Sequence, residues 1–304
     1  MKKYHKICLL KGGDSPEREV SLISAANYMK ALDELGVNYA DFDFFGDAAQ
    51  LIAHIKKENP ECVLNALHGG SGENGNVQAV LNLMKIPYTH SGVMASAIAM
   101  DKRASRELFA KNGILVPAGF ATSWDEFRRH PSMEPPFVLK PVDGGSSVGV
   151  HIVKNPETLA SIDWQRKGNE ILVEEYVPGL ELTVGVLGDR PLEVTNLVVQ
   201  SGFLDYGNKY SAGHSLHEIP AKISPKVRNE ALETALKAHQ IIGCRGVSRS
   251  DFRYNDKTGE LYILELNTQP GMTPFSFVPE QAEFVGISFT QLTQWIIEKA
   301  CYDT

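Results

Sequence analysis

The chain has no long hydrophobic run, although 43% of its 304 residues are hydrophobic. No stretch approaches the roughly 20 apolar residues that are needed to span a bilayer. The basic start resembles that of a signal peptide, but the apolar run behind it covers only residues 7–10 before Lys11 interrupts it. We interpret this run as a first strand and expect no membrane as a partner.

Cysteine is scarce, and charge of one sign does not accumulate. The four cysteines, Cys8, Cys62, Cys244 and Cys301, form no CxxC pair, so a zinc or redox motif of that kind is not expected. We interpret them as reduced thiols of a cytoplasmic protein. The net charge of −7, without a block of like charges, argues against nucleic acid as a partner.

One glycine signature of nucleotide-binding folds is absent, and another is missing from the position where a dinucleotide fold needs it. The chain has no GxxxxGK[ST], and no GxGxxG follows the first strand, which argues against a P-loop and a dinucleotide fold. Glycines gather instead at residues 142–149, between strands predicted at 137–141 and 150–153. Backbone N–H groups and the hydroxyls of Ser146 and Ser147 can cradle phosphates in such a loop, with Lys140 as the point charge. A plain glycine-rich turn is the alternative.

The first hundred residues alternate between strands, predicted at 7–10, 39–45 and 62–67, and helices, predicted at 16–35 and 48–58. This alternation predicts a parallel sheet, whose ligands lie at the carboxyl ends of the strands. Glycine-rich turns follow the first and third strands, at residues 12–19 and 68–75. In these turns Glu17 is either a favourable charge at a helix start or a ligand contact, and His68 is either functional or structural.

The sequence pattern changes near residue 100 and again near residue 181. We place boundaries between three domains, 1–100, 101–180 and 181–304, and from about residue 181 the strands look antiparallel. The polar, aromatic segment 200–217 has no periodicity and is long for a loop, so it is a candidate lid. Further helices are predicted at 94–112, 225–242 and 279–300.

A hairpin organises the last domain. Two apolar runs, 247–254 and 261–267, flank a turn at 255–260. If the hairpin folds symmetrically about Thr258, Asp251 lies directly opposite Glu265, and a bulge would break that register.

The face that carries this pair also presents Arg249 and Asn267. Two opposed carboxylates repel each other, so we expect a cation between them. Carboxylate and amide oxygens suit Mg²⁺ held against a nucleotide phosphate; a solvated outer face is the alternative. Because removing one charge relieves the repulsion, we expect Asp251→Asn and Glu265→Gln to keep or raise stability without nucleotide.

A series of short motifs runs through nearly the whole chain, at residues 12–21, 68–75, 88–93, 101–102, 140–141, 145–149, 205–210, 249–251 and 265–273. In this order they resemble the motifs of one family, the D-alanine–D-alanine ligases of the ATP-grasp superfamily. The resemblance implies an α/β and α+β protein, in which an ATP-grasp fold is preceded by a parallel-sheet, Rossmann-like N-terminal domain.

The resemblance also implies an activity and its residues. The enzyme would join two D-alanines with ATP through an acyl phosphate, for peptidoglycan precursor synthesis in the bacterial cytoplasm, as a homodimer with two Mg²⁺ or Mn²⁺ ions. Implied ATP contacts are Lys102, Lys140, Ser147, Glu174, Val177, Glu181 and Lys209, and implied metal ligands are Asp251, Glu265 and Asn267. Implied substrate contacts are Glu17, His68, Arg249 and Ser276, and implied catalytic groups are Glu17, Ser146, Tyr210, Arg249 and Gly271.

Two other functions stay open. A ligase of the same family could use D-lactate as its second substrate and form an ester, whereas a nucleotide-binding regulatory protein could keep the fold without turnover. Relatives that form esters often carry histidine in place of Tyr210, and a phenol adds no charge there at neutral pH. Tyr210 therefore favours dipeptide formation, and the complete hairpin set disfavours the regulatory protein.

Overall fold

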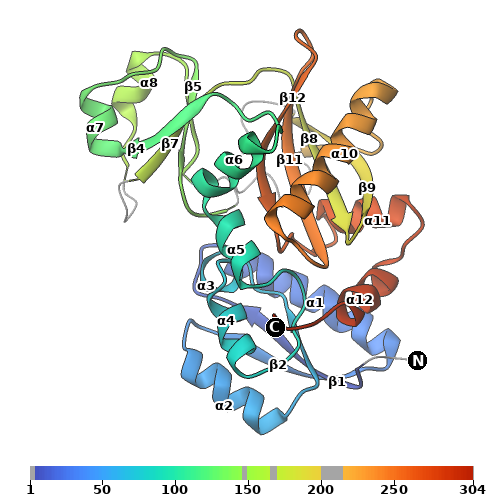
Figure 1. The fold of residues 1–304 in the computed structure, drawn as a ribbon. Coiled ribbons are helices and arrows are strands. Elements are labelled where there is room, and N and C mark those ends of the chain that lie inside the picture. The colour runs from blue at the N-terminus through green and yellow to red at the C-terminus, as the bar shows by residue number, and fades with distance from the viewer. Residues whose placement is uncertain (1–3, 146–148, 165–169, 200–214, 304) are drawn as a thin grey trace.

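The computed structural model describes residues 4–145, 149–164, 170–199 and 215–303 (Figure 1). Three sheets form the described part: one is parallel, and the strands of the other two pair antiparallel. The parallel sheet lies in the lower half of Figure 1, and the two antiparallel sheets lie side by side above it. The predicted fold class, α/β followed by α+β, is confirmed.

The parallel sheet has the order β2-β1-β3, with β1 at Lys6–Gly12, β2 at Asn38–Phe44 and β3 at Cys62–Asn65. The central strand β1 is buried on both sides because its alternate side chains enter two different cores. One core is closed by α1 (Arg18–Leu35) and α12 (Phe289–Glu298), and the other by α2 (Ala48–Glu58) and α4 (Asn76–Leu83). The last helix of the chain therefore packs on the first sheet.

The four-stranded sheet has the order β4-β7-β5-β6. Its core contains the aromatic side chains of Trp124, Phe127 and Phe137, contributed partly by the short helix α7. Its elements are β4 (Gly119–Ser123), α7 (Trp124–Arg129), β5 (Phe137–Pro141), β6 (His151–Val153), α8 (Pro156–Ser161) and β7 (Glu170–Glu175). The predicted strand, glycine loop and strand correspond to β5, the loop after it, and β6.

The five-stranded sheet has the order β10-β9-β8-β11-β12. Its β8 side chains alternate, so Leu182, Val184 and Val186 enter a core shared with α10. The opposite face of β8 is covered by α11. The elements are β8 (Leu180–Leu187), β9 (Arg190–Val199), β10 (Ser215–Glu218), α10 (Pro225–Ile242), β11 (Val247–Asn255), β12 (Glu260–Asn267) and α11 (Phe277–Phe284).

Two predicted helices are each divided in the structure. The segment 94–112 forms α5 (Val93–Met100) and α6 (Lys102–Lys111), because the Asp101 side chain accepts a hydrogen bond from the Ala104 N–H and starts a new helix. The segment 279–300 forms α11 and α12, which a left-handed Gly286 and a capping box at Ser288 separate. The polar turn 68–75 includes the short helix α3 (Gly70–Glu73).

The β11–β12 hairpin contains a register change. Asp251 pairs with Glu265 as predicted, but the next pair is Phe252 with Ile263, which leaves Leu264 as an extra residue in β12. Near the turn, the two strands are thus paired one residue away from the register that symmetry about Thr258 predicts. The predicted pair is right because the bulge compensates for that difference.

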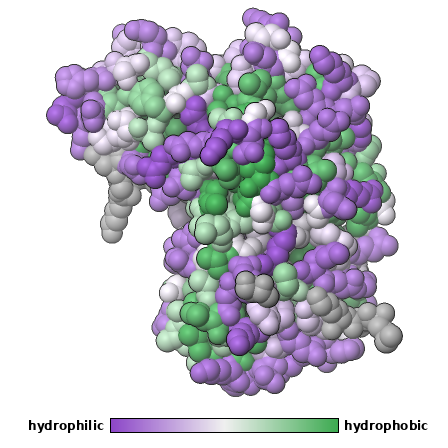
Figure 2. All heavy atoms as spheres, viewed as in Figure 1, coloured by the Kyte–Doolittle hydropathy of each residue, from purple (hydrophilic) through white to green (hydrophobic). Residues whose placement is uncertain are grey.

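The surface is mainly hydrophilic on the face in Figure 2, and hydrophobic side chains collect there near α4 and α5. These helices carry the most exposed apolar side chains, Leu83 and Met94. None of the helices in the described part of the chain combines the length and apolar character that a bilayer crossing demands.

The C-terminal tail connects three segments through Asp303. The carboxylate of Asp303 accepts hydrogen bonds from the Val93 N–H at the start of α5 and from the Asn82 amide, each 3.0 Å long, and it pairs with Arg245. Partial burial raises the pKa of Asp303, but the Asn82 and Val93 hydrogen bonds and the Arg245 charge outweigh it, so the pKa lies below its usual value.

We predict that Asp303→Asn lowers the free energy of unfolding at pH 7 by about 1 kcal/mol, a modest amount because Asp303 is partly exposed. Since its folded pKa is lowered, the carboxylate stabilises the protein above its unfolded pKa, and this contribution is lost as the pH falls through the folded pKa. Urea unfolding at several pH values measures the difference. A difference that is constant between pH 7 and pH 3, or equal to that of Asp256→Asn in the exposed β11–β12 turn, would contradict it.

Candidate active site

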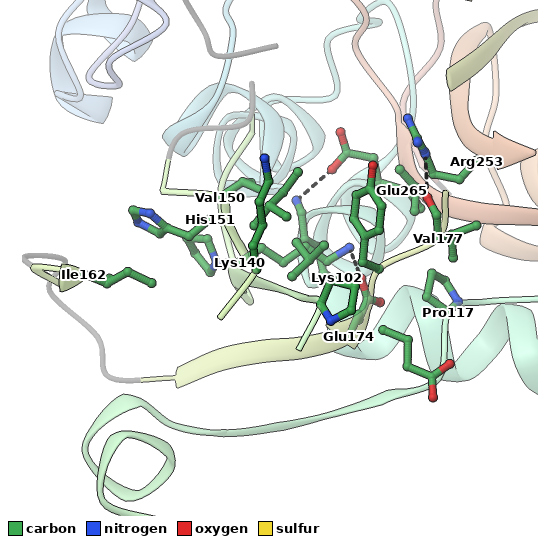
Figure 3. Close-up of a pocket in the computed structure, with 18 of the residues that line it drawn as sticks. Lys102, Pro117, Lys140, Val150, His151, Ile162, Glu174, Val177, Arg253 and Glu265 are labelled. Atoms are coloured by element: carbon green, nitrogen blue, oxygen red, sulfur yellow. Dashed lines mark hydrogen bonds and ion pairs between the residues drawn. The ribbon is translucent and has the colours of Figure 1, made fainter. Parts of the chain in front are cut away.

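A cavity of about 880 Å³ lies between the two antiparallel sheets. Strands β5, β6 and β7 line one side, β8, β11 and β12 line the other, and the start of α6 closes one end. Seven of the residues predicted to contact ATP or metal line it: Lys102, Lys140, Glu174, Val177, Glu181, Asp251 and Glu265. Figure 3 shows Lys102 and Lys140 beside Glu265 and Glu174 in this cavity.

Lys102 enters this cavity from the first turn of α6. Its Nζ lies 3.0 Å from Glu265 Oε2 on β12 and donates a 2.6 Å hydrogen bond to the Gly144 carbonyl (Figure 3). The Lys102 N–H also donates to the Val142 carbonyl. Because Lys102 is only 8% exposed, its charge is stabilised by these partners rather than by bulk water.

A second buried pair crosses the four-stranded sheet. Lys140 Nζ on β5 lies 2.5 Å from Glu174 Oε2 on β7 (Figure 3). Arg106 Nε lies 3.4 Å from Glu174 Oε1. Glu174 is 3% exposed. Its carboxylate is therefore held between two cations, Lys140 and Arg106.

Asp251 is surrounded by donors from three strands. Arg249 donates from Nε to Oδ1 at 2.8 Å and from Nη2 to Oδ2 at 2.7 Å. The Thr183 hydroxyl on β8 donates to Oδ1 at 2.6 Å, and the Asn267 amide donates to Oδ2 at 3.3 Å. The Asp251 carboxylate is consequently fixed in one orientation beside Glu265, its partner in the hairpin.

The repulsion between Asp251 and Glu265 is thus offset by side chains of the chain itself, Arg249 and Lys102. This observation reverses one expectation from the sequence, because removing either carboxylate also deprives a buried cation of its partner. The donor set of two carboxylates and an amide oxygen still fits a hard divalent cation such as Mg²⁺. Among the described residues no group of three His, Cys, Asp or Glu side chains is arranged to hold a metal.

Arg253 is a site residue that the sequence reasoning missed. It donates from Nε to the Val177 carbonyl at 3.0 Å and from Nη2 to the Gly179 carbonyl at 2.9 Å, and it lies 3.6 Å from Glu181 (Figure 3). Arg253 therefore holds the segment that links β7 to β8 against the cavity. The alternation of side chains along β11, which places Arg249 and Asp251 on one face, could have identified it.

The first sheet contributes Glu17 from the start of α1. An added Cβ at Gly69 would lie 2.2 Å from Glu17 Oε2, and one at Gly145 would lie 3.0 Å from the same atom. The carboxylate thus reaches both glycine-rich turns, 68–75 and 142–149. Glycine at 69 is also required by its positive φ of 64°. The structure brings Glu17 beside the glycine loop that follows Lys140.

His68 supports the junction between the parallel and the five-stranded sheet. Its Nε2 lies 3.0 Å from Ser24 Oγ and its Nδ1 3.4 Å from Glu73 Oε1. Ser24 Oγ in turn accepts a 3.2 Å hydrogen bond from the Met272 N–H, next to the predicted catalytic Gly271. These contacts give His68 a structural role, whatever it does toward a substrate.

Ser276 precedes α11 and is 3% exposed. Its Oγ accepts a 3.0 Å hydrogen bond from the Thr273 N–H and lies 2.8 Å from the Thr273 hydroxyl. The next residue, Phe277, lies under Arg249, with 5.5 Å from the guanidinium carbon to the ring centre. The structure therefore places the predicted oxyanion donor beside the start of α11.

Four predicted site residues, Ser146, Ser147, Lys209 and Tyr210, lie outside the described residues, as do residues 200–214 of the candidate lid.

Residues 123–298 match the family model described as D-ala D-ala ligase C-terminus. A D-alanine–D-alanine ligase of Azorhizobium caulinodans is 46% identical over 305 residues, covering 98% of each chain. The chain belongs to the D-alanine–D-alanine ligase family. A member from Caulobacter vibrioides is 48% identical, covering 97% of this chain and 92% of its own.

Two solved structures of ligases resemble the whole chain. The Bacillus anthracis D-alanine–D-alanine ligase complexed with ATP has a TM-score of 0.81 and 28% identity, and covers 98% of this chain and 97% of its own. The VanG D-Ala:D-Ser ligase of Enterococcus faecalis has a TM-score of 0.80 and 26% identity, and covers 97% and 99%. Ligases with different second substrates thus share this overall fold.

We predict that Glu265→Gln and Asp251→Asn each lower ligase turnover at least a hundredfold and, contrary to the sequence-based expectation, also lower thermal stability without nucleotide. The loss of stability follows because the buried Lys102 or Arg249 loses its carboxylate partner. Thermal unfolding and phosphate release at limiting magnesium measure the two effects. Glu260→Gln, at the exposed start of β12, is the matched control. Wild-type turnover at limiting magnesium would contradict the metal assignment, and an unchanged melting temperature would contradict the ion-pair argument.

Proposed function

We propose that this protein joins two D-alanines to D-alanyl-D-alanine at the expense of ATP. The observation that carries the proposal is the convergence at one cavity of the buried Lys140–Glu174 pair, the partly exposed Lys102–Glu265 pair, and Asp251 with its partner Arg249. Cations and carboxylates so placed suit a polyphosphate and a divalent ion. The ligase names of the relatives, and the ATP complex of the Bacillus anthracis ligase, support the same activity.

The nucleotide would occupy the cavity between the antiparallel sheets. Val177 and Glu181 belong to the segment that Arg253 holds, which suits adenosine contacts, together with Glu174. Lys102 and Lys140 would turn toward the phosphates, with Ser147 and Lys209 added on the resemblance alone. Each lysine is already held in the cavity by a carboxylate, so little ordering of these side chains is needed when ATP binds.

Asp251, Glu265 and Asn267 would hold the divalent ions, two of Mg²⁺ or Mn²⁺. When bound, these ions offset negative charge on the phosphoryl group that is transferred. Because Asp251 already accepts hydrogen bonds from Thr183 and Arg249, its carboxylate is oriented before any ion arrives.

The reaction follows from the weakness of a carboxylate as an acyl donor. The carboxylate of the first D-alanine attacks the γ-phosphoryl group of ATP, which yields an acyl phosphate and ADP. The amine of the second D-alanine, after losing a proton, attacks the carbonyl carbon, and phosphate leaves as the peptide bond forms. Glu17 would hold the ammonium of the first D-alanine, and Ser276 the carboxylate of the second.

Charge develops on the carbonyl oxygen during the second step. Arg249 and the Gly271 N–H would stabilise this oxyanion. Ser146 and Tyr210 would complete a hydrogen-bonded set with Glu17, and His68, the first residue of the 68–75 turn, would contact a substrate. On the sequence and the resemblance alone, residues 200–214 of the predicted lid 200–217 would cover the site, since an acyl phosphate hydrolyses when water enters. The prediction is wrong for residues 215–217, which belong to β10 and pair with β9.

We further propose that the enzyme works in the bacterial cytoplasm, where ATP is available, as a homodimer that supplies peptidoglycan synthesis. The fold alone does not select the second substrate, because a D-Ala:D-Ser ligase shares it. The choice of D-alanine over D-lactate rests on Tyr210, a residue without charge at neutral pH.

We predict that ATP consumption rises with D-alanine but not with L-alanine, and that D-alanyl-D-alanine is the main product at pH 7 and above when D-alanine and D-lactate are equimolar. Phosphate release and mass spectrometry of the products measure both. Ester as the main product at neutral pH would favour the depsipeptide ligase. ATP consumption that is independent of D-alanine would favour the regulatory protein.

A further inference from the structure

Gln281 lies in the middle of α11 and is completely buried between this helix and the five-stranded sheet. Its Oε1 accepts a 2.7 Å hydrogen bond from the Gly185 N–H. Its Nε2 donates to the Thr183 carbonyl at 3.1 Å and to the Thr195 hydroxyl at 2.9 Å. One side chain thus makes three hydrogen bonds to two strands, β8 and β9.

These bonds fall where the pairing of β8 with β9 is irregular. The register shifts between Val184 and Val186, so two residues of β9, Leu192 and Glu193, stand against Gly185 and the regular β8–β9 ladder is interrupted there. Buried backbone groups at such a gap need partners, and the Gln281 amide supplies them. Glycine at 185 is also required, since an added Cβ would lie 2.9 Å from Gln281 Oε1.

The two β8 residues that Gln281 contacts lie directly opposite two residues of the candidate active site. Thr183 pairs with Asp251 and Gly185 pairs with Arg249 across the β8–β11 ladder. The Thr183 hydroxyl additionally donates to Asp251 Oδ1 at 2.6 Å. The same helix begins directly after Ser276, and its first residue, Phe277, packs under Arg249.

We propose that Gln281 is a positioning residue for the acceptor side of the active site, the part that would bind the second D-alanine. This proposal rests on the function proposed above. By fixing α11 on β8, it sets Ser276, which would hold the acceptor carboxylate, relative to Arg249 and Asp251. Gln281 has no described contact with the ATP cavity, with Glu17 or with Lys102. Its loss should therefore impair attack by the second D-alanine more than phosphorylation of the first.

We expect phosphate release to become uncoupled from dipeptide formation. In Gln281→Met, which keeps the length of the side chain but removes its hydrogen bonds, the acyl phosphate still forms and is then lost to water. We expect the KM for the second D-alanine to rise about tenfold, the KM for ATP to change less than twofold, and the ratio of phosphate released to dipeptide formed to rise above two. Thr195→Val removes only one of the three bonds and should show the same change to a smaller extent, which keeps the test usable if Gln281→Met folds poorly.

Ile55→Ala is the control for a general loss of stability, because Ile55 is buried in the core between α2 and the parallel sheet. It should lower the melting temperature while the ratio of phosphate to dipeptide stays near one. A ratio near one and an unchanged acceptor KM in both Gln281→Met and Thr195→Val would overturn the proposal and leave the proposed function standing. A wild-type chain that forms no dipeptide would overturn both.

Discussion

The opposition of two carboxylates across β11 and β12 is the constraint on which the rest of the site depends. Asp251 and Glu265 are paired neighbours, and their repulsion is offset by two cations that come from different parts of the chain. Arg249 comes from the same strand, whereas Lys102 comes from α6, where the Asp101 cap starts the helix at the lysine. The break between α5 and α6 therefore helps to place Lys102 beside Glu265, where the lysine offsets negative charge on the hairpin.

This arrangement explains how the site can hold so much charge in a small space. An oppositely charged partner lies within 3.4 Å of each of five buried ions, Lys102, Lys140, Glu174, Arg249 and Asp251. Lys102 also donates a hydrogen bond to a carbonyl, and Asp251 accepts one from a hydroxyl. A buried charge without a partner would cost several kcal/mol. A nucleotide phosphate and its divalent ions could exchange with these partners, because phosphate offers the lysines a new anion while the metal offers the carboxylates a new cation.

The three sheets meet at the site through a few side chains. Glu17 from the parallel sheet lies against Gly69 and Gly145, the Ser24 hydroxyl joins His68 to the Met272 N–H, and Gln281 fixes α11 on β8. The donor, the nucleotide and the acceptor would therefore each be held mainly by a different part of the fold. This separation allows one half-reaction to be disturbed while the other continues, as expected for the Gln281 variants.

The sequence by itself determined the class of the fold, most elements, the motif order that identifies the family, and the opposed pair of carboxylates, because alternation and turn composition are local properties. It did not determine the bulge at Leu264, the break at Asp101 or the contacts of Arg253 and Gln281. The domain limits and the individual site roles stay predictions. Tertiary structure decided which cation meets which anion and which side-chain amide meets which backbone group. Lys102 and Glu265, like Gln281 and Gly185, are far apart in the chain, and only the packing of α6 and α11 on the sheets brings their atoms within hydrogen-bonding distance. Pairings of this kind depend on burial and on the exact path of each backbone, which no local pattern records.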